Sequence, residues 1–245
     1  MVIRTLKRFF PLAPICAAVA LSSCHGVTSS PPGPDQSESR SVDLDKAERV
    51  RAQLKMGAGE LDVRGGAAKL LDADFTYNVP EWKPDLRYTP GDLVLEQPGS
   101  TNSTSNTKNH WDLRFNDAVP LDLSVNFGAG EARLKAGTLN LRGLSVEIGA
   151  GKLTLDLRGK PSAGYSVHVS GGVGEAKIYL PKDVGISANV TGGLGEISAT
   201  GLRKNGDVYT NDANETAKVK IRLDIQGGVG SIKLIAEEPP RGSLL

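Results

Sequence analysis

The sequence predicts an all-β protein, built as a β-solenoid from coils of 21 to 23 residues. A short phrase of glycine, one small or apolar residue and a second glycine recurs, with its first glycine at residues 57, 128, 149, 172, 193 and 228. Four consecutive copies are 21, 23 and 21 residues apart, and a fixed period of this kind is typical of repeat architectures. Apolar residues alternate with polar residues before and after the copies, which is the pattern of half-buried strands.

A solenoid explains why these strands need one another. A single coil cannot bury its apolar face alone, whereas stacked coils bury it against neighbours about 4.8 Å away. Glycine at the corners permits positive φ and a close approach between coils. A β-sandwich of short strands is the alternative. It also explains the alternation and the turns, but not the fixed spacing between copies.

The first 23 residues have the organisation of a bacterial signal peptide. Three basic residues, Arg4, Lys7 and Arg8, precede an apolar stretch over residues 9–20 that is too short to cross a bilayer. Leu21, two serines and Cys24 follow, and this order resembles the lipobox, in which the cysteine receives the lipid. We therefore expect residues 1–23 to be removed and Cys24 to be lipidated. A plain secretory signal with a chance cysteine is the alternative.

Cys24 is the only cysteine left once residues 1–23 are removed, because Cys16 lies in the signal. No intrachain disulfide is then possible, and acylation explains an unpaired thiol in an exported protein. The expected partner at this end is a membrane, reached through a lipid anchor in the cell envelope. In a Gram-negative cell this means the outer membrane or a position facing the periplasm. Residues 24–47 are rich in Ser and Pro and are expected to form a tether.

The body of the chain divides into two parts by the regularity of its strands. Residues 48–118 are strand-rich but irregular, since segments rich in Pro, Ser and Asn interrupt the alternation. Residues 119–236 carry the regular coils, with a polar insertion at 203–218 that contains the hairpin signal Asn205-Gly206. Residues 237–245 are expected to form a frayed tail.

The charge balance gives no reason to expect nucleic acid as a partner. The formal net charge of the chain is +1, and beyond residue 23 there are 26 basic and 28 acidic residues. Mixed charge of this kind is typical of an ordinary solvated surface, whereas nucleic-acid binding needs a basic patch.

The corner motifs also carry a family resemblance. The segment Met-Gly-Ala-Gly-Glu-Leu at 56–61, the Gly-Gly-Ala at 65–67 with Phe75, and the paired Gly-Ala-Gly corners at 128 and 149 resemble the toast-rack domain over residues 48–235. That group is similar to the LiaF-like proteins of the cell-wall-active antibiotic response and to adhesin-like proteins with head-domain repeats. The resemblance implies a right-handed β-helix, an envelope location and no catalytic residues. The chain lacks the transmembrane segments of LiaF-type regulators, so their signalling role does not follow from it.

The glycine corners do not match two well-known ligand motifs. A phosphate-binding loop ends in Gly-Lys-Ser/Thr ahead of a helix, but here a strand follows. Calcium-binding nonapeptides need Asp where three of these copies have Ala176, Ile197 and Ile232, which offer no oxygen ligand. The histidines at 25, 110 and 168 have no metal-ligand spacing. We therefore expect no metal, no cofactor and no catalytic residue.

An acidic ladder follows the second glycine of the corners. It consists of Glu60, Glu131, Glu175 and Glu196, with Lys152 and Ser231 at the same position in the other copies. Stacked carboxylates repel one another, and Lys152, between two of them, relieves part of this repulsion. We expect these glutamates to face solvent or to accept hydrogen bonds from corner N–H groups. A weak cation or saccharide site is the alternative.

The irregular region contains aromatic and acidic residues that are candidates for a glycan groove. They are Trp82, Tyr88, Trp111, Asp85 and Asp112. Aromatic residues in such a place are more commonly part of the core or of a cap.

Together these observations predict a non-enzymatic lipoprotein of the bacterial cell envelope. Its solenoid would be a scaffold or an adhesin-like surface for an envelope protein or a glycan. The alternative is an envelope-stress sensor or regulator similar to LiaF-like proteins. A carbohydrate-active enzyme is a third class, because a β-helix does not by itself determine function.

Overall fold

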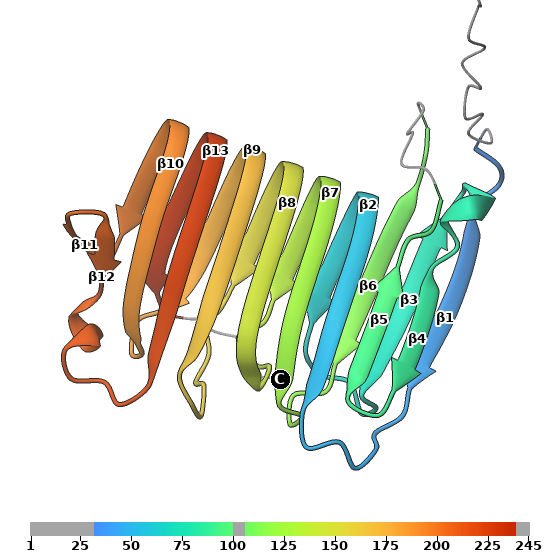
Figure 1. Cartoon of the computed structure of the whole chain (residues 1–245), viewed down its shortest axis with the longest axis horizontal. Helices are drawn as coiled ribbons and strands as arrows, with labels where there is room; N and C mark the ends of the chain where they lie inside the picture. Colours follow the sequence, from blue (N-terminus) through green and yellow to red (C-terminus); the bar gives the residue numbers. More distant parts are fainter. Residues whose placement is uncertain (1–31, 100–105, 239–245) are drawn as a thin grey trace, which may run out of the picture.

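Every strand that the structure describes belongs to one 13-stranded sheet (Figure 1). The structure is a computed structural model that describes residues 32–99 and 106–238. Apart from strands, these residues form two short 3-10 helices, η1 (Pro80–Trp82) and η2 (Asp212–Asn214). The all-β solenoid-like prediction is confirmed. The sandwich alternative is wrong, because the strands form one sheet rather than two.

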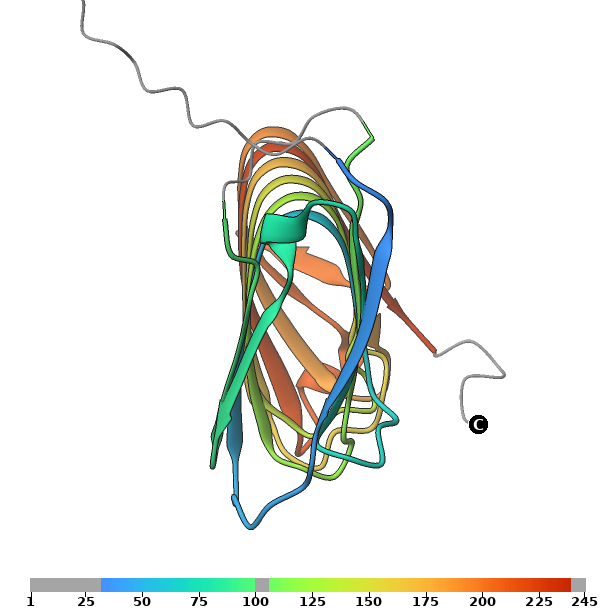
Figure 2. The same ribbon diagram turned by 90° about the vertical axis from the view of Figure 1, so that its right-hand side faces the viewer.

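Six long strands are the rungs of the molecule, and each runs through one glycine corner without a break. They are β2 (Val50–Arg64), β7 (Leu121–Lys135), β8 (Leu141–Asp156), β9 (Tyr165–Pro181), β10 (Gly185–Thr200) and β13 (Lys220–Glu237). Each strand bends at its corner into an arch, and Figure 2 shows the arches nested one behind another. The N-terminal limb before the corner lies in one wall and the C-terminal limb after it lies in the other. The corner does not end the strand, because each rung pairs with its neighbour in the same register on both sides of the corner.

The second glycine of each corner makes this bend possible. Its φ lies between 128° and 147° in the six rungs. At Gly174 φ is 145°, and a Cβ atom there would lie 1.8 Å from the carbonyl oxygen of Gly151 on the neighbouring rung. Residues with a Cβ are strained at such a φ, and no atom fits at such a distance. Both the bend and the close stacking therefore require glycine.

The rungs are parallel and in register, but their order departs from the sequence at one place. The order is β2, β7, β8, β9, β13, β10, so the last strand of the chain lies between two earlier ones. A hairpin of β11 (Arg203–Asn205) and β12 (Val208–Thr210) pairs with the outer edge of β10 at residues 187–189. This leaves the inner edge of β10 for β13. The hairpin is the protruding insertion predicted near 203–218.

Side chains along the rungs point inward and outward as the alternation predicts. The four residues expected to point inward are exposed by 3% or less: Val146, Ile178, Ile186 and Leu223. The three expected to point outward, Lys177, Lys220 and Arg222, are half-buried or exposed. Inward side chains from both walls form one hydrophobic cluster that runs the length of the stack.

The irregular N-terminal part closes one end of this stack. β5 (Asp92–Glu96) pairs with the N-terminal limb of β2, and β6 (Asn109–Phe115) pairs with its C-terminal limb. β4 (Asp85–Thr89) extends the sheet beyond β5, and β3 (Leu71–Tyr77) extends it beyond β6. Two amide side chains contact the corner of β2. Gly57 N donates to Gln97 Oε1 at 2.9 Å, and Asn109 Nδ2 donates to Ala58 O at 2.9 Å.

β1 (Gln36–Val42) corrects the tether predicted over residues 24–47. It pairs antiparallel with β3 at the edge of the sheet, so the prediction is wrong for this segment. Its side chains are exposed or half-buried, and an edge strand of this kind shows no apolar alternation in its sequence. Ser39 Oγ instead donates a hydrogen bond of 2.6 Å to Asp74 Oδ1. Cys24 and residues 239–245 lie outside the described residues, and Glu237 belongs to β13 rather than to the tail.

Candidate functional site

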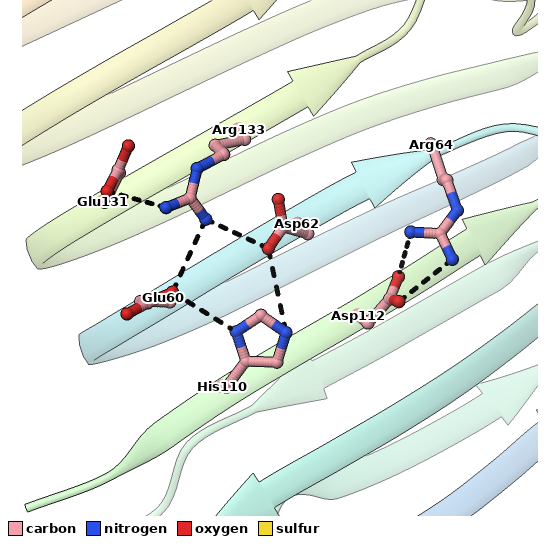
Figure 3. Close-up of polar contacts among 7 residues, drawn as sticks. All are labelled: Glu60, Asp62, Arg64, His110, Asp112, Glu131 and Arg133. Carbon is pink, nitrogen blue, oxygen red and sulfur yellow. Dashed lines mark hydrogen bonds and ion pairs between the residues drawn. The ribbon is translucent and has the colours of Figure 1, made fainter.

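The outer face of the C-terminal limbs carries a lattice of charged side chains (Figure 3). Seven of its members come from β2, β6 and β7: Glu60, Asp62, Arg64, His110, Asp112, Glu131 and Arg133. Parallel pairing in register places residues at equal distance from the corner side by side, so the lattice forms rows across the rungs.

Arg133 connects three carboxylates of this lattice. Its Nη1 lies 3.2 Å from Asp62 Oδ2 and 3.5 Å from Glu60 Oε2, and its Nη2 lies 2.7 Å from Glu131 Oε2. Desolvation lowers the pKa of Arg133, but Asp62, Glu131 and Glu60 together raise it, so the guanidinium stays charged. His110 lies on the other side of Glu60 and Asp62, at 3.6 Å and 3.8 Å from their carboxylates.

Three aspartates occupy one row on adjacent strands, where like charges would repel one another. Each contacts a different arginine: Asp62 with Arg133 at 3.2 Å, Asp112 with Arg64 at 2.7 Å, and Asp74 with Arg114 at 3.2 Å. Arginines on neighbouring strands therefore compensate the repulsion among the three aspartates. Their exposure makes each pair a modest contributor to stability, about 0–1 kcal/mol.

The glutamate ladder is partly compensated in the same way. Glu175 accepts a hydrogen bond of 3.1 Å from Lys233 Nζ and lies 3.4 Å from Lys177 Nζ. The hydrogen bond from Lys233, followed by the charges of Lys177 and Lys233, lowers the pKa of Glu175. Insertion of β13 also places Ser231 between Glu175 and Glu196, which separates two carboxylates that follow one another along the sequence.

The lattice is a polar surface on which carboxylates are paired with cationic side chains. Its central carboxylates are held by arginine or lysine, so they are poorly placed to take a metal ion or a proton from a substrate. Within residues 32–99 and 106–238, no three His, Cys, Asp or Glu side chains gather as a metal site. His168, on the other wall, contacts Asp224 at 3.3 Å. The cation-site alternative for the ladder therefore finds no support in the described part of the chain.

A shallow groove of about 590 Å³ lies over the N-terminal limbs of five rungs, on the other wall. Its centre is formed by the small residues Ser124, Gly143, Ser145 and Ser166 and by Asp122, whose carboxylate lies beside Gly143. Longer side chains stand at its two ends: Arg51 and Gln53 at one, and His168, Arg222 and Asp224 at the other. Hydroxyl groups in a hollow between longer polar side chains suit a polar ligand, such as a glycan or an extended peptide. We refer to this surface as the serine groove.

The aromatic residues do not form the glycan groove considered from the sequence. Trp111 and Trp82 are 0% and 2% exposed. Trp111 packs edge-on against Phe75, with ring centres 5.7 Å apart. Both tryptophans are therefore core residues, which separates them from Tyr88, Asp85 and Asp112 at the surface.

The serine groove was not found from the sequence. Its signal is an outward position that holds a small residue in consecutive coils, as Ser124 and Ser145 do. The groove also needs His168 and Asp224 to lie in the same row, and that depends on the insertion of β13 beside β9. Sequence spacing alone does not reveal this order.

Comparison with known protein families identifies the fold. The family described as "N-terminal domain of toast_rack, DUF2154" matches residues 31–179, which is more than half of the chain. The chain belongs to the toast-rack family. The rest of the toast-rack fold, including β10 and β13, lies beyond the matched residues and completes the stack of arches.

A solved structure shares this toast-rack fold. A "putative cell adhesion protein" from Clostridium sporogenes is 32% identical with a TM-score of 0.81, and the match covers 83% of this chain and 100% of that chain. A "putative adhesin" from Bacteroides fragilis matches at 11% identity with a TM-score of 0.35, covering 82% of this chain and 97% of that chain. The comparison with curated proteins found no match. Among the described residues of this toast-rack protein, no helix is long and apolar enough to span a membrane.

Proposed function

We propose that this toast-rack protein is a non-enzymatic lipoprotein of the cell envelope that presents an adhesin-like binding surface. The observation that carries this proposal is the match to the "putative cell adhesion protein" of Clostridium sporogenes, which extends over the full length of that chain. The serine groove is the surface for an envelope protein or glycan partner. The charged lattice keeps the opposite wall soluble and rigid.

The lipid anchor is tested at Cys24. We expect Cys24→Ser to leave the precursor uncleaved and without fatty acid, because lipidation of the lipobox cysteine precedes removal of the signal. Metabolic labelling with a fatty acid and the size of the protein on a gel measure both effects. Cys16→Ser is the matched control, since this cysteine lies in the removed segment, and it should be labelled and processed normally. Normal acylation of Cys24→Ser would contradict the lipoprotein assignment.

The serine groove is tested by site-specific photo-crosslinking in the bacterium that makes the protein. A photoreactive residue at Ser145 should form a covalent adduct with a partner, because Ser145 lies at the centre of the groove. The matched control is Thr154, which lies on the same rung, β8, but on the charged face. Gel mobility and mass spectrometry of the adducts identify the partner.

The pattern of adducts separates the possible outcomes. Adducts at 145 and not at 154 support the groove as the binding surface. Equal adducts at both positions, or none at 145, would show that the groove is not where the partner binds. An adduct between residue 145 and a membrane-embedded signalling protein would favour the envelope-stress sensor, similar to LiaF-like proteins, over the adhesin-like function.

A further inference from the structure

We call the stack of rungs, together with the strands that close its end, the rack. The corners of the six rungs form a continuous uncharged strip along one edge of the rack, the upper edge in Figure 1. We call this strip the crest. It consists of residues 57–59, 128–130, 149–151, 172–174, 228–230 and 193–195, in stacking order. Each triplet is two glycines around one apolar residue, so no charged side chain lies within the crest.

The apolar residue of the crest grows in size toward one end of the stack. It is alanine in β2, β7 and β8, and then Val173 in β9, Val229 in β13 and Leu194 in β10. These last three side chains are exposed by 59%, 51% and 75%, and they are neighbours by strand pairing. A cluster of large, solvent-exposed apolar side chains is typical of a surface that contacts another protein or a membrane.

The chain enters the rack at this same edge. Gly33 N donates a hydrogen bond of 2.7 Å to Asn78 O, directly after β3, and β1 then runs from the crest side to the opposite edge (Figure 1). Eight residues lie between Cys24 and Gly33, so these two residues are at most about 30 Å apart. A lipid on Cys24 would therefore hold the β1 end of the rack close to a bilayer, on the side of the crest.

We propose that the crest rests on the lipid surface, with Val173, Val229 and Leu194 inserted at the boundary between headgroups and acyl chains. This inference rests on the proposed lipid anchor at Cys24. β10 lies eight strand positions from β1, about 38 Å along the stack. With an anchor at one end alone, the rack can change its orientation relative to the bilayer. Apolar residues at the far end supply a second contact, and two weak membrane contacts hold far better than one.

The charges beside the crest indicate that its contact with lipid is apolar rather than electrostatic. The charged residues within two positions of a crest triplet are five glutamates and two lysines: Glu60, Glu131, Glu147, Glu175, Glu196, Lys55 and Lys152. Arg133, Lys177 and Lys233 contact these glutamates from further along the limbs. The border therefore has no excess of positive charge that would attract anionic lipid, so insertion is driven by the apolar side chains. The contact should form on zwitterionic lipid and persist at high salt, which screens exposed charges. It also leaves both walls, and with them the serine groove, accessible to a partner.

The test uses the mature chain from Cys24, coupled through its single cysteine to a maleimide lipid in phosphatidylcholine vesicles with brominated acyl chains. Leu194→Trp should show blue-shifted emission and quenching by bromine, both unchanged at high salt. The matched control is Leu44→Trp, since Leu44 is 49% exposed and follows β1 at the edge opposite the crest. Its emission should be quenched no more than that of the unsubstituted protein, whose Trp82 and Trp111 are buried.

Three outcomes would overturn the proposal: absence of quenching at position 194, equal quenching at 194 and 44, or loss of the quenching at high salt. The oligomeric state of the uncoupled chain, measured by sedimentation, gives a fourth. If the chain is a dimer and Leu194→Asp converts it to a monomer, the crest is an interface between two copies of this chain and not a lipid-binding surface. Because the vesicle anchor is chemical, these results do not depend on acylation in cells. Failure to label Cys24 in cells would remove the proposed function, while the vesicle experiment would still report whether the crest contacts lipid.

Discussion

Ile178→Asp should unfold the rack. Ile178 is 0% exposed and lies between Leu155 on β8 and Leu234 on β13, which are also 0% exposed. An unpaired carboxylate in this position would cost several kcal/mol. That is comparable to the total stability of a domain, about 5–15 kcal/mol. Circular dichroism melts of the variant should show loss of the cooperative transition, or a transition at a far lower temperature.

Lys177→Asp is the control for this change, because Lys177 is the adjacent residue on the outward face. Its side chain is 41% exposed and contacts Glu175 at 3.4 Å. Glu175 keeps Lys233 when Lys177 is lost, so the effect on stability should stay within about 1 kcal/mol. Equal tolerance of the two substitutions would mean that the inward and outward register of the rungs is wrong.

Gly174→Val should destabilise the rack nearly as strongly. The strain of a β-branched residue at a φ of 145° costs about 1–3 kcal/mol. In addition, the new Cβ would lie 1.8 Å from the carbonyl oxygen of Gly151, so β8 and β9 would have to separate at the corner. Thermal or urea unfolding should show a loss larger than the strain alone, because the damaged contact is between backbones and not between flexible side chains.

Two alanine variants in the same strand separate the requirement for glycine at the bend from the general cost of replacing a glycine. Gly174→Ala meets the same backbone oxygen and should still be clearly destabilised. Gly171→Ala is the matched control, since its Cβ would meet only Ile148 Cγ2 at an ordinary 3.5 Å and its φ is not positive. It should change stability by less than about 1 kcal/mol. Equal stability of the two alanine variants would be incompatible with a bend that requires glycine at 174.

The coils could be predicted from the sequence because their signals are local. Alternation over a limb, as at Ile186 and Leu223, reports which face is buried, and a corner that needs positive φ selects glycine in every copy. Both signals repeat, so each copy strengthens the interpretation of the others. The family resemblance rested on these same corners.

Other features could not be predicted because they depend on pairing between distant segments. β1 is held at the sheet edge by hydrogen bonds to β3, and its exposed, polar side chains give no pattern. The row of Asp62, Asp112 and Asp74 forms only because β6 and β3 join the C-terminal limb of β2. The groove needs β9 and β13 as neighbours. In each case the deciding interaction joins backbones or charges far apart in the sequence, and composition does not encode it.

The position of β13 delays the completion of the fold until the end of synthesis. The rungs from β2 to β9 can pair in the order in which they emerge, each on its predecessor. β10 emerges next, but the strand that pairs along its whole length begins only at Lys220, after β10 has ended at Thr200. Until the C-terminus arrives, two rungs have open edges, which is the stage most vulnerable to proteases and to mispairing. A nascent chain cut short before β13 would thus leave a gap inside the rack, between β9 and β10.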